Sequence, residues 1–293
     1  MQGAITAIIT PFQADGSVDY AALDRVIDHQ LKHDIDGIVV CGSTGEAITL
    51  TPAERQAVVG HAVKRVARRK PVLAGTSASS TAETVDFTRK VRELGANGAL
   101  IAAPAYNRPQ QEGLYLHFAA VAKAVPGFDI MLYNIPGRTA VNIATETIVR
   151  LVSDFPASFT SYKDATGNLK QADELLAICP HMAFFSGDDA ATLPLGALGA
   201  VGIVSVVSNL IPADMVALCR AISSGDFARA RAIHRKALPV IDACFTESNP
   251  VPVKAGAALL GLCLENVRPP LAPIHAKNRQ AMKSALTAHG VLA

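Results

Sequence analysis

Apolar segments of strand length recur along this chain roughly every 20–35 residues, and this repetition constrains its fold more than any other feature. The segments are 4–10, 37–41, 71–75, 99–103, 129–133, 159–163, 183–186 and 202–206. Amphipathic stretches separate them, and in 19–33 and 140–152 the apolar residues are spaced by three and four positions, which indicates helices. Strands that alternate with helices predict a parallel sheet covered by helices, because each crossover returns the chain to the same end of the sheet.

Helix-start signals support this alternation. Thr51-Pro52-Ala53-Glu54 is typical of a capping box with proline at the first helical position, and Ser80-Thr81-Ala82-Glu83 is a second capping box. Eight strand–helix units over about 220 residues predict an α/β fold, the (β/α)8 TIM barrel, with a doubly wound open sheet as the alternative. We expect the barrel over 1–223 and a C-terminal helical extension, packed on the barrel, over 224–293. A helix is expected at 213–222, just before the extension, and further helices within it at 227–245, 251–260 and 278–288.

Composition and charge exclude several classes of partner. Half of the 293 residues are hydrophobic, which is enough for a large core, and the formal net charge is only +2. The basic cluster at 64–70 is typical of a solvated helix end, so we expect no nucleic-acid partner. Segment 190–213 carries no charge over about the length of a membrane span, but prolines and glycines interrupt it, so we expect no membrane partner.

The cysteines give no sign of a metal site or a disulfide framework. The chain has five of them, widely scattered and without the paired spacing that metal ligation requires. The N-terminal segment lacks a signal-peptide pattern, since it has no charged start and Asp15 interrupts its apolar run early. A reducing compartment, and hence a cytoplasmic location, is the simplest interpretation.

Lys163 is the strongest candidate for chemistry. It ends the apolar segment 159–163 and leads directly into a turn. Chemistry on a (β/α)8 barrel occurs at the carboxyl ends of the strands, and Lys163 is the one lysine predicted to lie there. Burial at that position favours the neutral, nucleophilic amine, which is the form that makes a Schiff base with a carbonyl substrate. The neighbouring Tyr162 points to the opposite face of the strand, so we assign it to packing.

Other strand ends carry residues that suit the same chemistry. Tyr133 ends segment 129–133 and is a candidate proton shuttle beside the amine. The turn after 37–41 contains Ser43 and Thr44 between glycines, and its N–H groups and hydroxyls predict a carboxylate nest. Arg138 follows Tyr133 and can hold a second carboxylate in a bidentate pair. Each feature has a purely structural alternative. Tyr133 is then an aromatic at the barrel rim, the Ser43–Thr44 segment an ordinary turn, and Arg138 a partner in a surface salt bridge.

Taken together, these motifs resemble the pyruvate-dependent class I aldolases, the group that contains the dihydrodipicolinate synthases and the N-acetylneuraminate lyases. The resemblance covers essentially the whole chain. The motifs, in order, are Gly42-Ser43-Thr44-Gly45-Glu46, Tyr133-Asn134-Ile135-Pro136-Gly137-Arg138-Thr139, Lys163-Asp164-Ala165-Thr166-Gly167-Asn168, Ser186-Gly187-Asp188-Asp189 and Asn249-Pro250-Val251-Pro252-Val253-Lys254. Arg138 and the segment Tyr106-Asn107-Arg108-Pro109 point more narrowly to the synthase branch.

The resemblance implies a mechanism. Lys163 condenses with the keto group of pyruvate, and the resulting enamine attacks the aldehyde of L-aspartate 4-semialdehyde, in the route to diaminopimelate and lysine. Tyr133, Ser43 and Tyr106, the last from a neighbouring subunit, are implied to form the proton relay.

The resemblance also implies how the substrates are held. Thr44 and the main chain of Val204 bind pyruvate, Gly187 lines the pocket, and Arg138 binds the semialdehyde carboxylate. It implies a homotetramer, built as a dimer of dimers, and no metal or organic cofactor, because the lysine itself is the electron sink.

Three departures from the synthase pattern bear on the substrate. Ser43 stands where threonine is usual, Ala105 replaces a second tyrosine, and Ser161-Tyr162 replaces the usual glycine and isoleucine before the lysine. Another pyruvate-dependent aldolase or dehydratase, acting on a sugar acid or hydroxy-oxo acid, is the alternative within the same fold. A non-catalytic binding barrel is disfavoured, because Lys163 and Tyr133 are both present.

Feedback inhibition by lysine is expected to be weak or absent. In lysine-inhibited synthases the effector lies in a cleft at the tight-dimer interface, next to the loop that matches Tyr106. The positions that bind it are held here by Pro52, Arg55, Ser79 and Ala105, and of the usual polar partners only Glu83 is kept. A cationic ligand that loses its hydrogen-bonding partners on leaving water binds poorly. An inward-turned Arg55 that holds the lysine carboxylate is the alternative.

Overall fold

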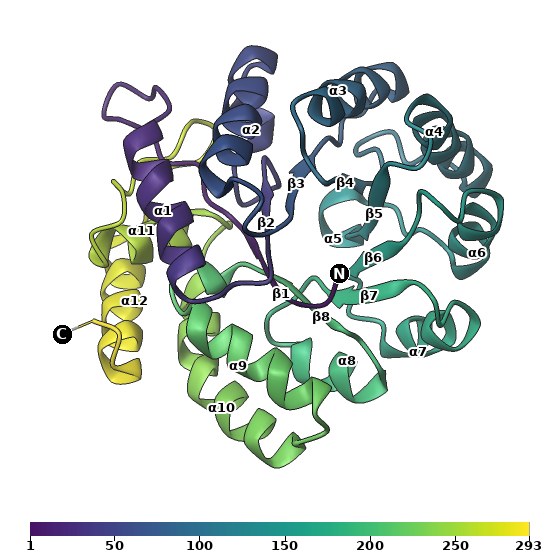
Figure 1. Ribbon diagram of the computed structural model, residues 1–293. Helices are drawn as coiled ribbons and strands as arrows, with labels where there is room; N and C mark the ends of the chain where they lie inside the picture. The colour runs from purple at the N-terminus through teal and green to yellow at the C-terminus, as the bar shows by residue number, and fades with distance from the viewer. Residues whose placement is uncertain (293) are drawn as a thin grey trace.

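A closed barrel of eight parallel strands forms the centre of the computed structural model, which describes residues 1–292. Each strand pairs with the next along the chain, and β8 closes the ring by pairing with β1, as Figure 1 shows. The strands are β1 (Gly3–Ala7), β2 (Gly37–Val40), β3 (Val72–Gly75), β4 (Gly98–Ala102), β5 (Asp129–Asn134), β6 (Ser161–Asp164), β7 (Ala183–Ser186) and β8 (Gly202–Ser205). The (β/α)8 prediction is therefore confirmed, and the open-sheet alternative is wrong.

Helices surround the barrel, and most strands are followed by at least one of them (Figure 1). They are α1 (Tyr20–Lys32), η1 (Ala47–Thr49), α2 (Pro52–Val66), α3 (Thr81–Glu93), α4 (Gln111–Ala124), α5 (Pro136–Thr139), α6 (Thr145–Asp154), α7 (Leu169–Ile178), α8 (Thr192–Leu198), η2 (Val207–Asn209), α9 (Pro212–Ser223), α10 (Phe227–Cys244), α11 (Val251–Leu259) and α12 (Ala276–His289). The capping box at Thr51 forms in both directions with Glu54. At Ser80 the side chain accepts from the N–H of Glu83, so one half of the predicted box is present.

Two predicted boundaries are wrong by several residues. The strand expected over 4–10 ends at Ala7: the Ile8 N–H still donates to the Val39 carbonyl of β2, but the Ile9 N–H donates to the Asn209 side chain instead of a strand. The helix expected over 140–152 begins at Thr145, since Ala140 adopts a left-handed backbone conformation that ends α5. Apolar periodicity does not register such a break, because the apolar residues Val141 and Ile143 between the two helices still pack against the core.

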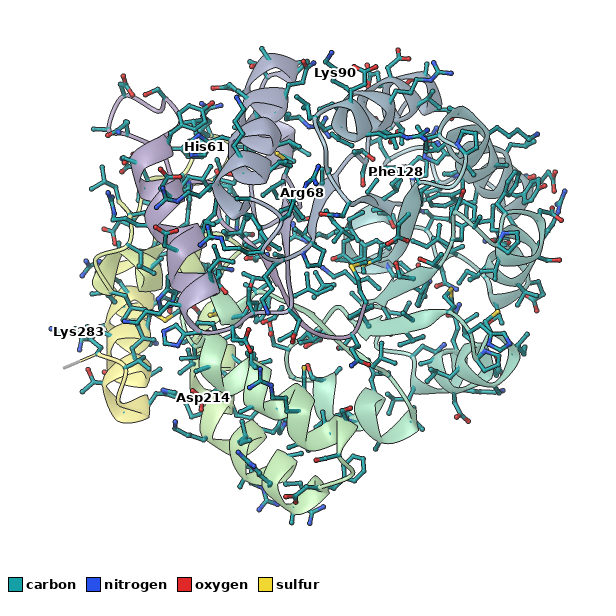
Figure 2. The ribbon with its side chains drawn as sticks, viewed as in Figure 1. His61, Arg68, Lys90, Phe128, Asp214 and Lys283 are labelled. Carbon is teal, nitrogen blue, oxygen red and sulfur yellow. The ribbon has the colours of Figure 1, made fainter. Side chains whose placement is uncertain are left out.

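The barrel interior has its own apolar cluster, separate from the layer between strands and helices. Its buried members are Ile5, Ala7, Val39, Leu73, Leu100, Met131, Tyr133, Phe185 and Val204. Burial of a large apolar side chain contributes roughly 1.5–3 kcal/mol, so this cluster stabilises the closed ring. Figure 2 shows the side chains that fill the space between the barrel and its helices.

The tail adds three further helices to the barrel. Helix α10 packs against α9, and α12, yellow in Figure 1, packs against α10 and α11. The predicted division at residue 223 falls at the end of α9, and as a domain boundary it stays a prediction. No helix within residues 1–292 combines the length and hydropathy needed to cross a membrane, and the uncharged segment 190–213 divides into α8, β8 and η2.

Candidate active site

Lys163 lies in β6 and points into the barrel. In the parallel register its Cα pairs with that of Tyr133 on one side and that of Phe185 on the other, and both belong to the interior cluster. Tyr162 faces the opposite way and packs on Phe184 in the outer layer, as expected for a strand. Only 4 % of Lys163 is exposed. The prediction of a buried lysine near the carboxyl end of a strand is thus confirmed.

Burial changes the acid–base behaviour of this lysine. Desolvation lowers the pKa of Lys163 to about 7, the negative charge of Asp189 opposes the shift, and the positive charge of Arg138 adds to it. A large fraction of the amine is therefore neutral at physiological pH, which is the form that attacks carbonyl carbon. Lysines on the outer helices are not buried in this way. Lys90 and Lys283, labelled at the rim in Figure 2, are exposed to solvent.

The Tyr133 ring lies against the Lys163 amine. Its ring centroid lies 4.2 Å from the Lys163 Nζ atom, a distance at which a cation is stabilised by the ring face. Burial raises the pKa of the Tyr133 phenol, an effect that Arg138 partly offsets. The phenol therefore keeps its proton at neutral pH, and it can donate that proton to a developing oxyanion.

A cavity of about 380 Å³ opens at the carboxyl ends of β2 to β5. Ser43, Tyr133 and Arg138 line it, so the structure brings together three of the residues predicted from the sequence. The remaining lining is small and mostly apolar: Cys41, Gly42, Ala47, Ile48, Gly75, Ser77, Ala78, Ser79, Leu100, Ala102, Ala103, Ala105, Ile135 and Thr139. A cavity of this size fits a small ligand rather than an extended one.

The loop after β2 is tightly folded beneath this cavity. Backbone bonds run from Gly45 N–H to the Gly42 carbonyl and from Glu46 N–H to the Ser43 carbonyl. Ser43 is exposed towards the cavity, whereas Thr44 is buried and its Oγ1 accepts a hydrogen bond of 3.0 Å from Asn249 Nδ2. The two hydroxyls of the predicted nest therefore have different surroundings, which the sequence pattern did not distinguish.

Arg138 lies on the short helix α5 at the mouth of the cavity and is exposed. Its Nη2 donates to the main-chain carbonyl of Asn249 at 3.2 Å. Within residues 1–292 Arg138 has no carboxylate at ion-pair distance. A cation that lines a cavity without a carboxylate partner is suited to bind an anionic ligand there.

Gly187 and Val204 lie close to the lysine side of the site. A Cβ atom at Gly187 would lie 2.9 Å from the Lys163 Cε atom and 2.8 Å from the Asp164 carbonyl oxygen, so glycine leaves the room that the lysine stem occupies. Val204 belongs to the interior cluster on β8. The carboxylate of Asp189 accepts from the Ser205 hydroxyl and from the N–H groups of Val206 and Val207, which holds the end of β8 beneath the lysine.

Tyr106 stands apart from the other candidates in the single chain. It is 95 % exposed, its φ of 82° is unusual for a non-glycine residue, and it does not line the cavity. Ile48, which does line the cavity, is 93 % exposed. Two nearly fully exposed large side chains in loops at the same end of the barrel indicate a surface suited to a protein partner.

Comparison with known proteins places this site in a family. The sequence profile of the Dihydrodipicolinate synthetase family matches residues 1–289. The chain belongs to this family. A 4-hydroxy-tetrahydrodipicolinate synthase from Pelobacter propionicus is 44 % identical over 99 % of both chains.

Solved structures of the dihydrodipicolinate synthetase family superpose closely on the chain. Dihydrodipicolinate synthase from Aquifex aeolicus gives a TM-score of 0.96 at 41 % identity, covering 98 % of this chain and 97 % of that one. The chloride-inhibited enzyme from Acinetobacter baumannii, complexed with pyruvate, gives 0.96 at 38 % identity, covering 99 % of each. The fold and the family are therefore established over nearly the full length.

Sequence reasoning missed three residues that shape the site of this dihydrodipicolinate synthetase family member. Asn249 contacts both Thr44 and Arg138. Lys254 is fully buried and pairs with the buried Glu46, although its place in the tail had suggested no role. Asp189 is buried beneath Lys163, and burial raises its pKa to about 6. All three lie in the motifs on which the family resemblance rests, but membership of a motif does not show which residues a side chain contacts.

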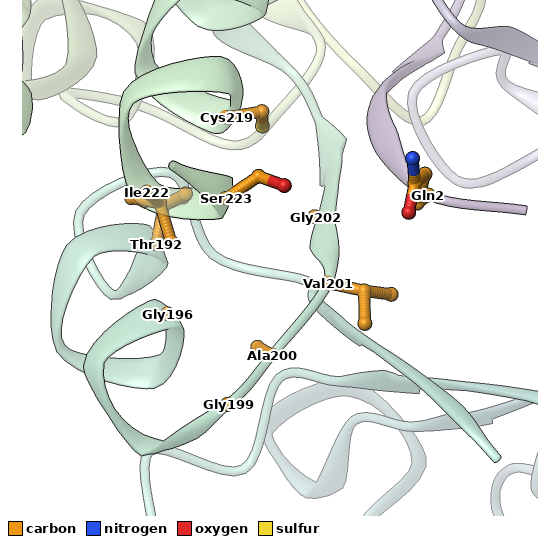
Figure 3. Close-up of a pocket in the computed structure, with 10 residues that line it drawn as sticks. All are labelled: Gln2, Thr192, Gly196, Gly199, Ala200, Val201, Gly202, Cys219, Ile222 and Ser223. Carbon is orange, nitrogen blue, oxygen red and sulfur yellow. The ribbon is translucent and has the colours of Figure 1, made fainter. Parts of the chain in front are cut away.

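A second cavity lies at the opposite end of the barrel. It measures about 210 Å³ and is lined by Gln2 just before β1, by Val201 and Gly202 at the start of β8, and by residues of α8 and α9, as Figure 3 shows. Burial raises the pKa of its Cys219 thiol to about 12, which leaves that thiol unreactive. Among residues 1–292 no group of three or more His, Cys, Asp or Glu side chains is arranged to hold a metal ion.

Proposed function

We propose that the protein is a 4-hydroxy-tetrahydrodipicolinate synthase, a lyase that joins pyruvate to L-aspartate 4-semialdehyde in the biosynthesis of diaminopimelate and lysine. The observation that carries this proposal is the inward-facing Lys163, with a pKa of about 7, in a chain that matches the family from end to end. The family relatives carry the synthase name, and one neighbouring structure contains pyruvate.

The first half of the reaction activates pyruvate on Lys163. The neutral amine adds to the keto carbon, and the resulting carbinolamine loses water to form an imine. Tyr133, which keeps its proton at neutral pH, donates to the departing hydroxide, and its ring face stabilises the cationic iminium nearby. The Tyr133 phenolate then takes a proton from the methyl group, which gives the enamine and restores the phenol.

The second half forms the carbon–carbon bond and releases the lysine. The enamine carbon attacks the aldehyde carbon, and the alkoxide takes up a proton from the relay. The substrate amine then adds to the imine carbon and displaces Lys163, which closes the ring and regenerates the free amine. Tyr133, Ser43 and a neighbouring subunit's copy of Tyr106 are the proposed proton relay.

The binding roles follow from the chemistry of the two substrates. Thr44 and the main chain of Val204 hold the pyruvate carboxylate and keto group, and Gly187 leaves space for the imine. Arg138 holds the semialdehyde carboxylate, a role supported by its exposed position at the mouth of the cavity. An arginine at this position favours an acidic second substrate over the polyhydroxylated substrates of related lyases.

The proposed assembly is a homotetramer, a dimer of dimers, in which Tyr106 reaches the site of the adjacent subunit. Its exposure and its strained backbone support this role, because such strain persists where surrounding structure holds it. Pyruvate and the semialdehyde are the proposed small-molecule partners, and the proposed location is the cytoplasm.

A coupled assay with pyruvate and L-aspartate 4-semialdehyde tests the function directly. We expect turnover that needs both substrates and that falls by roughly 30-fold in kcat/KM in Arg138→Ala, about 2 kcal/mol, while pyruvate trapping on the enzyme survives. Arg138→Lys, which keeps the charge but not the bidentate fork, should fall in between. Turnover of another aldehyde in preference to the semialdehyde would contradict the proposal.

A further inference from the structure

Asn249 connects the two carboxylate-binding elements of the proposed site. It lies just before α11, and only 9 % of it is exposed. Its side-chain Nδ2 donates to Thr44 Oγ1 at 3.0 Å, and its main-chain carbonyl accepts from Arg138 Nη2 at 3.2 Å. One residue from the tail therefore contacts the loop after β2 and the arginine after β5.

The contact with Thr44 has a direction. An amide NH2 group can only donate, so the Thr44 oxygen is the acceptor in this bond. The hydroxyl hydrogen of Thr44 is left to donate elsewhere, and within residues 1–292 it has no acceptor. A hydroxyl that is held in place from behind and has a free hydrogen is a preorganised donor for a carboxylate.

The other end of the same amide is unpaired. Asn249 Oδ1 is buried and has no hydrogen-bond partner among the described residues. An unpaired buried acceptor costs roughly 1–3 kcal/mol, so such atoms usually mark a place where a ligand or water completes the network. In this site it lies on the residue that already contacts both proposed carboxylate binders.

The loop that carries Thr44 cannot move freely away from Asn249. The next residue but one, Glu46, is buried against Lys254 of α11, and the N–H of Arg268 donates to the second oxygen of its carboxylate. The Thr10 hydroxyl also donates to the Gly45 carbonyl. The tail therefore anchors the loop at Glu46 and Thr10 anchors it at Gly45, directly after Thr44.

We propose that Asn249 is a positioning residue that directs the Thr44 hydroxyl hydrogen towards the carboxylate of the oxo-acid substrate. The inference rests on the proposed function, and it adds that the tail helps to determine how tightly the first substrate binds. Asn249→Asp reverses the contact, because its carboxylate accepts the Thr44 hydrogen and repels the substrate carboxylate.

The test is borohydride trapping of pyruvate on the enzyme, measured by mass against pyruvate concentration. This readout does not depend on the identity of the second substrate. Asn249→Ala should raise the half-saturating pyruvate concentration roughly 5–30-fold, as expected for loss of 1–2 kcal/mol, and Asn249→Asp should raise it further. Lys170→Arg, on the solvent face of α7, is the control and should match the wild type.

A double-mutant cycle separates positioning from mere structural support. If Asn249 acts through the Thr44 hydroxyl, Asn249→Ala should have little added effect on pyruvate trapping in a Thr44→Val background. Thermal unfolding of each variant serves as the stability control, and Asn249→Ser replaces Asn249→Ala in the cycle if the alanine variant does not fold.

The possible outcomes are distinct. Additive effects of the two substitutions, or equal trapping by Asn249→Asp and Asn249→Ala, would overturn the inference and leave the proposed function standing. A wild-type protein on which pyruvate leaves no trapped adduct would overturn the proposed function, and the positioning role with it.

Discussion

The Nζ atom of Lys163 lies 4.2 Å from the centroid of the Tyr133 ring, and the two residues are register partners on adjacent parallel strands. This relationship sets the chemistry of the site. The barrel interior removes both side chains from water, which lowers the pKa of the amine and raises that of the phenol. Burial alone thus places a nucleophile and an acid side by side, each in its useful protonation state at neutral pH.

Lys163→Arg should abolish turnover, with a loss of more than about 10³-fold, because a guanidinium does not form an imine. Borohydride with pyruvate should leave one adduct per chain, and peptide mapping should place it on Lys163. Lys170→Arg, on the solvent face of α7, is the matched control and should leave activity unchanged. An adduct on a different lysine would refute the mechanism.

The pH profile of pyruvate trapping should rise through about pH 7, because the amine must lose its proton before it attacks. Substitutions at its two charged neighbours should move this profile in opposite directions. Arg138→Ala removes a charge that lowers the lysine pKa, so the profile should shift to higher pH. Asp189→Asn removes a charge that raises it, so the profile should shift to lower pH. Shifts of the same sign would show that these charges do not act on Lys163.

Gly187→Ala should impair trapping and destabilise the protein by roughly 1–3 kcal/mol, because the added methyl group overlaps the Lys163 stem and the Asp164 carbonyl. Chemical denaturation and borohydride trapping measure the two effects. Gly60→Ala on α2 is the matched control, since a Cβ there meets Leu94 at an ordinary contact distance of 3.6 Å. The control substitution should leave the free energy of unfolding unchanged or raise it, because alanine is more favourable than glycine within a helix. Equal behaviour of the two variants would argue against the steric role of Gly187.

L-Lysine should inhibit weakly, with half-inhibition no lower than the millimolar range. Arg55 is turned inward: its Nη2 donates to the Gly75 carbonyl and its guanidinium carbon lies 4.1 Å from the Phe87 ring centroid. Arg55 lines a cavity of about 390 Å³ that Glu83 also lines. The Arg55 charge therefore faces a cationic ligand, while its Nη2 is already bonded to the Gly75 carbonyl and its Nε is buried. The measurement is enzyme activity in the coupled assay against L-lysine concentration. Inhibition at micromolar lysine would show that this interpretation is wrong.

The active unit should be at least a dimer, because Tyr106 lies too far into solvent to serve the cavity of its own chain. Sedimentation at assay concentration should show no active monomer. Mixing Tyr106→Phe with Lys163→Arg should restore part of the activity, since a mixed pair contains one site with both native residues. No recovery from a mixture that exchanges subunits would contradict a shared relay.

The local pattern of the sequence was sufficient to predict the barrel and to place the proposed nucleophile inside it. Apolar segments of strand length predicted the strands to within a few residues, since burial on both faces leaves a continuous signal that short-range spacing records. The same reasoning placed Lys163 inside and Tyr162 outside, because successive side chains of a strand point to opposite faces. A second rule, that chemistry on a barrel occurs at the carboxyl ends of the strands, identified Ser43, Thr44 and Arg138.

Tertiary structure alone decided which of these residues meet and what supports them. Asn249 contacts Thr44 across 205 positions, and Lys254 pairs with Glu46 across 208. Such pairings depend on how the tail folds back over the barrel, which no spacing within a helix or strand specifies. The pKa of Lys163 is likewise a property of its surroundings, because desolvation and two charges from distant segments set it. The order of residues along the chain determined the fold and the position of the proposed nucleophile, whereas contacts between distant segments determined the geometry and electrostatics of the site.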